Sequence, residues 1–456
     1  MSYDPQYRVE DNTIKVATTG NVDSGKTTLT GCLVNNMLDN GKGSARNTIM
    51  KVKHEIESGR TSKISFNYLK FGDDAKNPHT TTERKKITKI ITMVDLAGHE
   101  KYLKTTMFGL TGLFVDYALV VVSAEDGVIG TTKEHLGILI HLKVPILVVI
   151  TKIDRAPEHM YENTLNQLKK IFKNKHIKKK PVFINKDTDK EQALEEIEKY
   201  TEIMENTNKI VPIISVSNKT GQNFDLVNML LYNLKPRVMW DKYKIDGSVY
   251  YIDSKYNVKG IGLVLSGTVQ GQNIKVNDNM YLGPLKNGKF IPFKIRSLHN
   301  NIREDVPFIE DREIGCMAIK FTSKQVLVKK QIKKGMIAIS QAQYDKNVCW
   351  KFKAEVTILQ HSTTIETNYQ PVIHCNNVRQ TAKIILKEEQ VLRVNDTAEV
   401  TFQFILNPEF MVKGSKLFFR DGKTKGVGRV VEVIPMEKNK GKEKKGKTPT
   451  KGLLDI

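Results

Sequence analysis

The stretch 20-GNVDSGKTT-28 decides how the first half of this chain folds, because it matches the phosphate-binding pattern G-x-x-x-x-G-K-S/T. An apolar run, IKVATT (residues 14–19), leads into it, and TTLTGCLVNNML (residues 27–38) follows with leucines at helical spacing. Gly20 and Gly25 would let the backbone curl its N–H groups around phosphate oxygens at the start of a helix. The stretch therefore predicts a nucleotide site rather than an ordinary turn.

Two residues of this stretch have a defined chemistry. The Lys26 ammonium would lie on the β- and γ-phosphates, and the Thr27 hydroxyl would ligate Mg²⁺. The residues expected to surround the phosphates are Gly20, Asn21, Val22, Asp23, Ser24, Gly25, Lys26, Thr27 and Thr28.

The composition is that of a soluble protein of about three domains, since the chain has 456 residues. The longest apolar runs are too short to cross a membrane, and the N-terminus shows no secretory signal. Four scattered cysteines, Cys32, Cys316, Cys349 and Cys375, fit a reducing compartment and argue against a zinc site. We therefore expect a cytoplasmic protein, in the host cytoplasm if it is viral, with no membrane association.

The charge balance favours a polyanionic partner, because 72 Lys and Arg face 50 Asp and Glu, a net charge of +22. RNA is the leading candidate, and the alternative is a lysine-rich surface that reflects an AT-rich genome. Basic residues cluster at 169–180 and in the tail at 437–456. We expect this tail to be disordered, and it either touches RNA or is a solvated end.

Strand and helix patterns alternate from residue 13 to about residue 234. The expected strands are residues 13–19, 86–96, 116–123, 145–151 and 210–217, and the expected helices are residues 27–38, 100–110, 132–142, 160–172 and 224–234. This alternation predicts a doubly wound parallel sheet, with a ligand beyond the carboxyl ends of its strands.

The pattern changes after residue 245, where short β-rich runs separated by turns replace the helical periodicity. A second β-rich set begins near Cys349, so the spacings suggest two β-barrels. The chain is therefore expected to comprise an α/β P-loop domain at 1–238, β-barrel domains at 239–345 and 346–436, and the basic tail at 437–456.

Two further motifs fall at expected strand ends on the phosphate side. In DLAGHE (residues 95–100), Asp95 would hold Mg²⁺ through water, and the Gly98 N–H would contact a γ-phosphate. In TKID (residues 151–154), the Asp154 carboxylate would accept two hydrogen bonds from N1–H and the amine of guanine, a donor pair that adenine lacks. The stem of Lys152 would cover the base.

A last motif, SVSNKTG (residues 215–221), places Ser217 and the backbone of Asn218 and Lys219 near the base oxygen. Four motifs in this order predict GTP and GDP as ligands, with Mg²⁺.

These motifs resemble those of the translational GTPases, the superfamily of elongation factor Tu and elongation factor 1-alpha, and most closely the GTP-binding protein 1 family. The resemblance runs from about residue 15 to residue 434 and includes HEIESGRTS, DLAGHEKYLKTTMFGLTG, GTTKEHLGI, VSNKTGQNFDLVNMLL and HSTTIETNYQPVIHC. It implies a G domain followed by two β-barrels, and a GTPase that binds aminoacyl-tRNA in its GTP state and acts at the ribosome.

The resemblance also assigns catalytic residues. Thr61 matches the switch I threonine that ligates Mg²⁺ together with Thr27 and Asp95. A rival is the threonine run at residues 80–82, and Thr61 is preferred because its separation from Lys26 is like that of the relatives. His99 matches the histidine that positions the attacking water, and Lys26 and Asp23 complete the catalytic set. Asp23 matches an aspartate that holds a monovalent cation.

The sequence departs from the commoner pattern at two positions. Thr151 stands where most GTPases have Asn, and we expect this to weaken the link between base and phosphate loop. Arg60 stands where elongation factor Tu has an aliphatic gate residue, and it is the only candidate for an arginine finger in cis. The intrinsic rate of hydrolysis is therefore expected to be slow.

In relatives the first barrel holds the aminoacyl end of tRNA and the second holds its T-stem. The resemblance places His299 on the terminal adenosine, where its ring would stack, and Arg379 and Lys383 on phosphates. An exposed loop histidine and solvated strand positions are the alternatives. We expect a monomer, and two other functions stay open: a ribosome-rescue or surveillance GTPase, and a GTP-switched RNA-decay adaptor.

Overall fold

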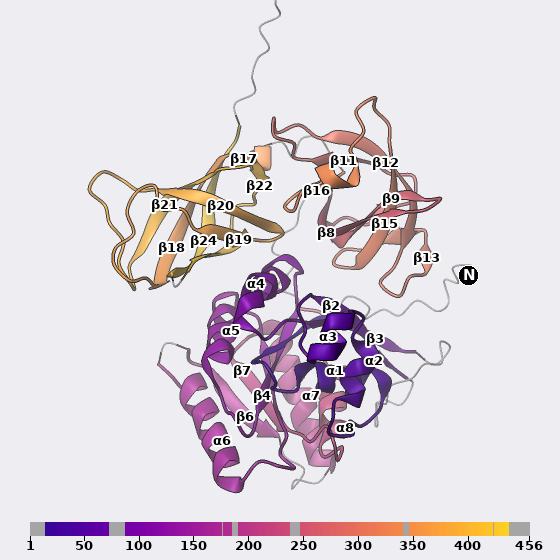
Figure 1. The fold of residues 1–456 in the computed structure, drawn as a ribbon, viewed down its shortest axis with the longest axis vertical. Coiled ribbons are helices and arrows are strands. Elements are labelled where there is room, and N and C mark those ends of the chain that lie inside the picture. Colours follow the sequence, from indigo (N-terminus) through magenta and orange to yellow (C-terminus); the bar gives the residue numbers. More distant parts are fainter. Residues whose placement is uncertain are drawn as a thin grey trace, which may run out of the picture.

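A computed structural model describes residues 14–72, 87–175, 177–184, 190–237, 247–340, 346–422 and 424–436. An α/β domain forms its lower part in Figure 1, and two β-barrels lie above it. The boundary residues 238, 239 and 345 and the expected tail at 437–456 lie outside the described residues, so the domain limits stay a prediction. Among the described helices, none is long and apolar enough to cross a bilayer.

The sheet of the α/β domain has seven strands in the order β2-β3-β1-β4-β5-β7-β6. They are β1 (Lys15–Gly20), β2 (Ser65–Phe71), β3 (Lys89–Asp95), β4 (Tyr117–Ser123), β5 (Ile146–Thr151), β6 (Lys180–Ile184) and β7 (Ile210–Ser215). Every neighbouring pair is parallel except β2 and β3. The carboxyl ends of β1, β3, β5 and β7 therefore meet at one edge.

Helices cover both faces of this sheet because its central strands are apolar on both sides. In β4, Ala118 and Val120 pack toward one face, and Leu119 and Val121 pack toward the other. The first face carries α4 (Leu103–Gly112), α5 (Gly130–His141) and α6 (Glu158–Phe172), and the second carries α1 (Lys26–Asn35), α7 (Lys190–Asn206) and α8 (Phe224–Tyr232). The doubly wound arrangement expected from the alternation is present.

The structure corrects the sequence prediction in several elements. The predicted parallel sheet carries an antiparallel edge strand, β2, and β6 and α7 were not predicted. Two short helices, α2 (Ser44–Ile49) and α3 (Lys53–Ser58), were also missed, and the first three residues of the helix predicted at 100–110 form a 3₁₀ turn, η3 (Glu100–Tyr102). Helix α1 ends at Asn35 instead of residue 38, because Asn36 adopts a left-handed conformation with φ 48°.

The first barrel closes six strands in the order β11-β16-β8-β9-β15-β12, since β12 also pairs with β11. They are β8 (Ser248–Val258), β9 (Gly262–Gly271), β11 (Asn279–Gly283), β12 (Ile291–His299), β15 (Ile314–Phe321) and β16 (Ile337–Ile339). Strand β13 (Asp305–Val306) pairs antiparallel with the end of β12, β10 (Ile274–Lys275) pairs with β14 (Phe308–Ile309), and η5 (Lys329–Gln331) is a 3₁₀ turn.

The second barrel is closed in the order β18-β21-β20-β19-β23-β24. They are β18 (Lys351–Gln360), β19 (Val372–Cys375), β20 (Val378–Ile385), β21 (Thr397–Phe404), β23 (Lys416–Asp421) and β24 (Thr424–Ile434), and β17 (Val348–Cys349) pairs with β22 (Glu409–Phe410). The predicted fold class, an α/β P-loop domain followed by two β-barrels, is confirmed.

Polar contacts join both barrels to the α/β domain. Lys15 of β1 is buried, and its Nζ donates to the carbonyl of Leu113 at 3.4 Å and to Thr268 Oγ1 of the first barrel at 3.3 Å. Lys425 of the second barrel forms an ion pair with Glu134 at 2.9 Å. The first contact therefore joins the first barrel to β1, and the second joins the second barrel to α5.

Candidate nucleotide site

The loop after β1, residues 20–28, forms the floor of the site, and we call it the phosphate loop. Gly20 has φ 146°, and a methyl group built on it would lie 2.2 Å from the Val121 carbonyl oxygen, so no larger residue fits. Gly25 has φ 84° and precedes α1. Lys26 is buried and its Nζ donates to the Asn21 carbonyl at 2.6 Å, which closes the loop around its own lysine.

Long-range hydrogen bonds hold this loop in place. Thr131, at the start of α5, donates to Asn21 Oδ1 at 2.5 Å, and Thr19 Oγ1 lies 2.7 Å from His135 Nδ1. Burial lowers the pKa of His135 to about 3, so its imidazole is neutral. Thr131 and His135 lie in the stretch GTTKEHLGI, which is shared with the family but had no role assigned to it from the sequence.

Thr151 supports the phosphate loop, and the expected weakening of the link between base and loop stays a prediction. Its Oγ1 donates to the Ser24 carbonyl at 2.7 Å from the end of β5. The hydroxyl of Thr151 therefore makes the contact with the phosphate loop. Unlike Asn, Thr151 has no amide that could also contact the base.

Three oxygen-bearing side chains meet where the metal was expected. Thr27 Oγ1 donates to Asp95 Oδ2 at 2.9 Å, Thr61 Oγ1 lies 2.9 Å from Thr27 Oγ1, and Thr61 also donates to Asp95 Oδ2 at 3.3 Å. Asp95 is fully buried, and its Oδ1 has no hydrogen-bond partner among the described residues. The rival run at residues 80–82 lies outside the described residues.

The electrostatics of this corner suit a divalent cation. Burial raises the pKa of Asp95 to about 6, while Lys26 and the two threonine hydroxyls oppose the shift. Burial likewise lowers the pKa of Lys26 to about 8, opposed by Asp95 and Asp23. Two hydroxyls and one buried carboxylate with a free oxygen are hard ligands of the kind that Mg²⁺ prefers, so the residues present fit this ion.

Two buried carboxylates shape residues 39–63, which we call the switch segment. Asp39 accepts hydrogen bonds from the backbone N–H groups of Gly41 and Ala45, at 2.8 and 3.0 Å. Glu55 accepts from the N–H of Ser62 at 2.7 Å and from its hydroxyl at 2.6 Å. The second set of bonds fixes the backbone next to Thr61 and thereby places its hydroxyl on Asp95.

An arginine that the sequence analysis did not single out lies inside the switch segment. The guanidinium of Arg46 lies between Gly43 and Gly59, where an added methyl group would approach it to 2.5 and 2.6 Å respectively. Its Nε is buried without a partner among the described residues, and the side chain lines the nucleotide cavity. No short motif marks such an arginine, because its place depends on two glycines on either side of α2 and α3.

The DLAGHE motif closes the phosphate end. A methyl group on Gly98 would lie 2.4 Å from Lys26 Nζ and 2.7 Å from the Gly20 carbonyl oxygen, so this glycine packs directly on the phosphate loop. His99 is half-buried and lines the cavity, and its Nδ1 accepts a hydrogen bond from the Lys101 N–H at 3.1 Å. That bond leaves Nε2 as the protonated nitrogen of the neutral ring.

At the base end, Ser217 orients the carboxylate that was expected to recognise guanine. The buried hydroxyl of Ser217 donates to Asp154 Oδ1 at 2.7 Å and accepts from the N–H of Thr220 at 3.0 Å. The sequence analysis placed Ser217 near the base oxygen. That position stays a prediction, and the hydroxyl also contacts Asp154, which orients the expected acceptor for the base.

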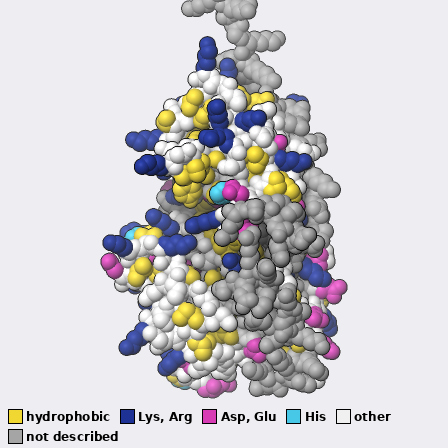
Figure 2. Space-filling view, turned by 90° about the vertical axis from the view of Figure 1, so that its right-hand side faces the viewer, with side chains coloured by type: hydrophobic (Ala, Val, Ile, Leu, Met, Phe, Trp, Pro, Cys, Tyr) yellow, Lys and Arg dark blue, Asp and Glu magenta, His cyan; other side chains and the backbone are white. Residues whose placement is uncertain are grey.

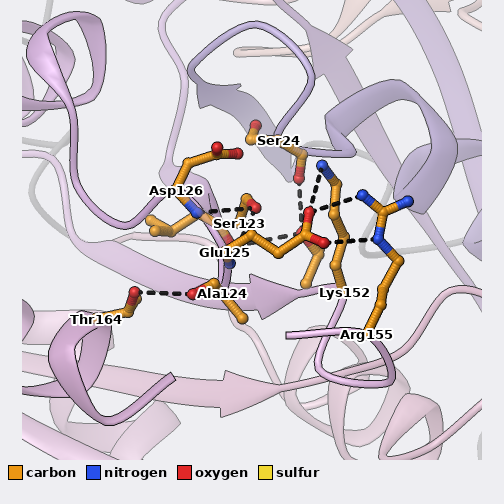
Figure 3. A network of polar contacts seen from close by, with 10 residues as sticks. Ser24, Ser123, Ala124, Glu125, Asp126, Lys152, Arg155 and Thr164 are labelled. Atoms are coloured by element: carbon orange, nitrogen blue, oxygen red, sulfur yellow. Dashed lines mark hydrogen bonds and ion pairs between the residues drawn. The ribbon is translucent and has the colours of Figure 1, made fainter. Parts of the chain in front are cut away.

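Glu125, which follows β4, organises the residues beside Asp154 (Figure 3). It accepts hydrogen bonds from Arg155 Nε at 2.7 Å and Arg155 Nη2 at 2.8 Å, and Lys152 Nζ lies 3.4 Å from its second oxygen. The hydrogen bond from Arg155 is the main cause that lowers the pKa of Glu125. The carboxylate of Glu125 therefore fixes the end of the Lys152 side chain, and no sequence motif pointed to Glu125.

Most of the expected residues meet around one cavity of about 470 Å³. Those that line it are Val22, Asp23, Gly25, Lys26, Thr27, Thr28, Arg60, Thr61, Gly98, His99, Lys152, Asp154, Asn218 and Lys219. The others form the layer behind this wall: Gly20, Asn21, Ser24, Asp95, Thr151 and Ser217.

The residues expected to contact RNA lie on the barrels. His299 Nε2 is 2.8 Å from Asp305 Oδ1 and lines a second cavity, of about 760 Å³, between the switch segment and the first barrel. Arg379 and Lys383 point outward from β20, whose residues alternate between buried and partly exposed. Lys and Arg side chains gather over the barrel part of the face in Figure 2.

Comparison with known proteins identifies the family of this chain. The model of the elongation factor Tu GTP binding domain matches residues 11–236. GTP-binding protein 1 of Xenopus laevis is 38% identical over 436 residues, and GTP-binding protein 2 of Homo sapiens is 35% identical over 433 residues. The chain belongs to the GTP-binding protein 1 and 2 family. That family lies within the translational GTPase superfamily of elongation factors Tu and 1-alpha, so the resemblance read from the motifs is confirmed.

The matches cover 93% and 92% of this chain, which spans 64% and 69% of the lengths of the two relatives. Among solved structures, translation elongation factor SelB from Methanococcus maripaludis in complex with the GTP analogue GppNHp has a TM-score of 0.64 at 20% identity. That match covers 94% of this chain and 81% of SelB, and it shows a shared three-domain fold.

Proposed function

We propose that this chain is a cytoplasmic translational GTPase that binds GTP with Mg²⁺, holds aminoacyl-tRNA in the GTP state and hydrolyses GTP at the ribosome. The observation that carries the proposal is a wall shared by two cavities. Thr27 and Thr61 line the nucleotide cavity, and they also line the larger cavity between the switch segment and the first barrel, together with Asp95.

This shared wall gives a physical route from nucleotide to RNA. Thr61 reaches Asp95 only while the switch segment lies over the site, and Mg²⁺ with a γ-phosphate favours that position. The opposite wall of the larger cavity comes from the first barrel and includes His299, Arg303 and Cys316. The cavity is therefore complete in the GTP state and loses one side when the switch segment relaxes, which suits a state-dependent pocket for the 3′ end of tRNA.

Hydrolysis would rest on positioning by this chain's own residues. Mg²⁺, held by Thr27, Thr61 and Asp95, neutralises phosphate charge when bound. Lys26 turns from the Asn21 carbonyl to the phosphates, and the Gly98 N–H contacts the γ-phosphate.

His99 would orient the attacking water through Nε2. Asp23, which lines the cavity with φ 59°, would hold a monovalent cation beside the transferred group. The chain provides Arg60 and Arg46 in the same cavity as cations in cis.

The tRNA body would bind by charge on the second barrel. Arg379 and Lys383 share the outer face of β20, and burial lowers the pKa of Lys334, with Arg379 as a further cause. This places Lys334 near Arg379 as a third cation of the patch. Lys334 precedes β16 of the first barrel, so the three cations come from both barrels, and such charges suit phosphate contacts that position an RNA without reading its sequence.

A fluorescence titration with labelled tRNA tests the proposal. Aminoacyl-tRNA should bind the form with a non-hydrolysable GTP analogue at least about tenfold better than the GDP form, a coupling of roughly 1.4 kcal/mol. Deacylated tRNA should bind weakly to both, and Lys26→Ala should abolish the difference.

Lys383→Ala should weaken both complexes more than the control Lys351→Ala, an exposed lysine on β18 of the same barrel. Equal binding of charged and uncharged tRNA in every nucleotide state would contradict a carrier and favour an RNA-decay adaptor.

A further inference from the structure

The base-binding end of the site has no hydrogen-bond donor for guanine N7 at position 151, and one other residue can supply it. In most GTPases the residue that corresponds to Thr151 is an Asn, which contacts both the phosphate loop and the base. Here Thr151 donates its one hydroxyl proton to the Ser24 carbonyl at 2.7 Å, and it is buried. Guanine N7 is a hydrogen-bond acceptor without a proton. Thr151 therefore has no donor left for N7.

A carboxamide lies beside Thr151. A methyl group built on Gly25 would lie 3.3 Å from Asn218 Nδ2 and 3.4 Å from Thr151 Oγ1, so both side chains meet on the same side of this glycine. Asn218 Oδ1 is buried without a hydrogen-bond partner in the described part of the chain, although the residue itself lines the nucleotide cavity. Oδ1 is an acceptor and cannot bond N7, so the relevant end of the amide is Nδ2, the donor that lies on the Gly25 side.

The backbone around Asn218 is held firmly. Its carbonyl accepts the N–H of Asp39 at 2.8 Å, and Ser217 is fixed by its bond to Asp154 at 2.7 Å. Asp154 takes the N1–H and amine edge of guanine, so the N7 edge of the purine faces away from Asp154. The phosphate-loop residue Gly25, next to which the Asn218 amide lies, is the part of the site on that side.

We propose that the Asn218 side chain donates a hydrogen bond to N7 of the guanine base and supplies the amide that position 151 lacks. The inference rests on the proposed guanine site and deepens it. In most GTPases one Asn makes both contacts. In this chain Thr151 makes the hydrogen bond to the phosphate loop, and Asn218 makes the hydrogen bond to the base. Guanine recognition is then kept by Asp154 and Asn218 together, and the replacement of Asn by Thr does not leave N7 without a donor.

The test compares GDP with 7-deaza-GDP, in which a C–H replaces N7, by equilibrium titration of the full chain. The wild type should bind 7-deaza-GDP about tenfold more weakly than GDP, the loss of one hydrogen bond to a ligand. Asn218→Ala should bind both nucleotides with equal affinity, near that of the wild type for 7-deaza-GDP. Thr220→Ala, an exposed neighbour in the same loop, should keep the tenfold preference.

A second variant separates recognition of N7 from mere support of the loop. Thr151→Asn in the Asn218→Ala background should restore the preference for GDP over 7-deaza-GDP, because the amide returns to its usual position. An unchanged preference in Asn218→Ala, or no preference in the wild type, would overturn the inference while leaving guanine binding intact. Failure of the wild type to bind GDP at all would overturn the proposed function itself.

Discussion

Gly98→Ala is the perturbation whose effect the structure defines best. The added methyl carbon would lie 2.4 Å from Lys26 Nζ, 2.7 Å from the Gly20 carbonyl oxygen and 2.8 Å from the Asn21 carbonyl carbon. The lysine end can move aside, but the other two atoms belong to the backbone of the phosphate loop. Overpacking of this kind costs about 1–3 kcal/mol, which corresponds to about 5- to 150-fold in an equilibrium constant.

The free-energy cost of this overpacking should weaken binding of GTP more than binding of GDP. Gly98 has to lie against the phosphate loop to reach a γ-phosphate, whereas the same loop can move away when GDP is bound. We therefore expect Gly98→Ala to weaken a non-hydrolysable GTP analogue by about 5- to 150-fold and GDP by less than about twofold. Stopped-flow measurement of association and dissociation with fluorescent nucleotides gives both affinities.

A matched control is Gly137→Ala in α5, where an added methyl group meets nothing within 4 Å. It should leave both affinities unchanged and slightly stabilise the helix. Equal weakening of GDP and the GTP analogue by Gly98→Ala would refute the reasoning, since the glycine would then support the loop in every state. No weakening of either would mean that Gly98 does not pack on the phosphate loop.

Three other predictions follow from the same site and its support. Asp154→Asn should weaken GTP and improve xanthosine triphosphate, because the amide can donate to the second base oxygen; equal affinity of the parent for ATP and GTP would contradict the assignment. His99→Ala should keep nucleotide affinity and lower ribosome-stimulated hydrolysis by at least about 10²-fold in single-turnover assays, and a loss of binding would show a structural role. Burial lowers the pKa of Lys15 from 10.5 to about 8 in the folded protein. Between pH 8 and pH 10.5 the Lys15 amine is therefore protonated more fully in the unfolded chain than in the folded protein. Wild-type stability should therefore rise relative to Lys15→Met by about 1 kcal/mol per pH unit from pH 8 to pH 10 in paired denaturant titrations, and a constant difference would contradict it.

The sequence could predict the parts of the site that are local. The phosphate loop, DLAGHE and TKID each combine a buried strand with the turn that follows it, so their residues meet wherever parallel strands end together. The resemblance also pointed to Thr61, whose hydroxyl lies beside Thr27 and Asp95 in the structure, and its role as a metal ligand stays a prediction. The identity of the metal and nucleotide stays a prediction.

Other contacts could not be predicted, because they join residues far apart in the chain. Thr131 and Asn21 are 110 positions apart, and Thr19 and His135 are 116 apart, so no local pattern links them. Helices α2 and α3 have six residues each, which is too short for a periodic signal. In the sequence Lys15 is a polar residue within a strand, and its partners, the Leu113 carbonyl and Thr268 of the first barrel, lie far from it in the chain.

Protection of the aminoacyl ester tests the central claim most directly. If the cavity between the switch segment and the first barrel holds the 3′ end in the GTP state, water is kept from the ester bond. The rate of ester hydrolysis at mildly alkaline pH should then fall at least about tenfold with saturating protein and a GTP analogue, the same factor as the expected coupling. With GDP it should equal the rate of free aminoacyl-tRNA. Equal hydrolysis rates with GTP analogue and GDP, at concentrations where the tRNA is bound, would contradict the account.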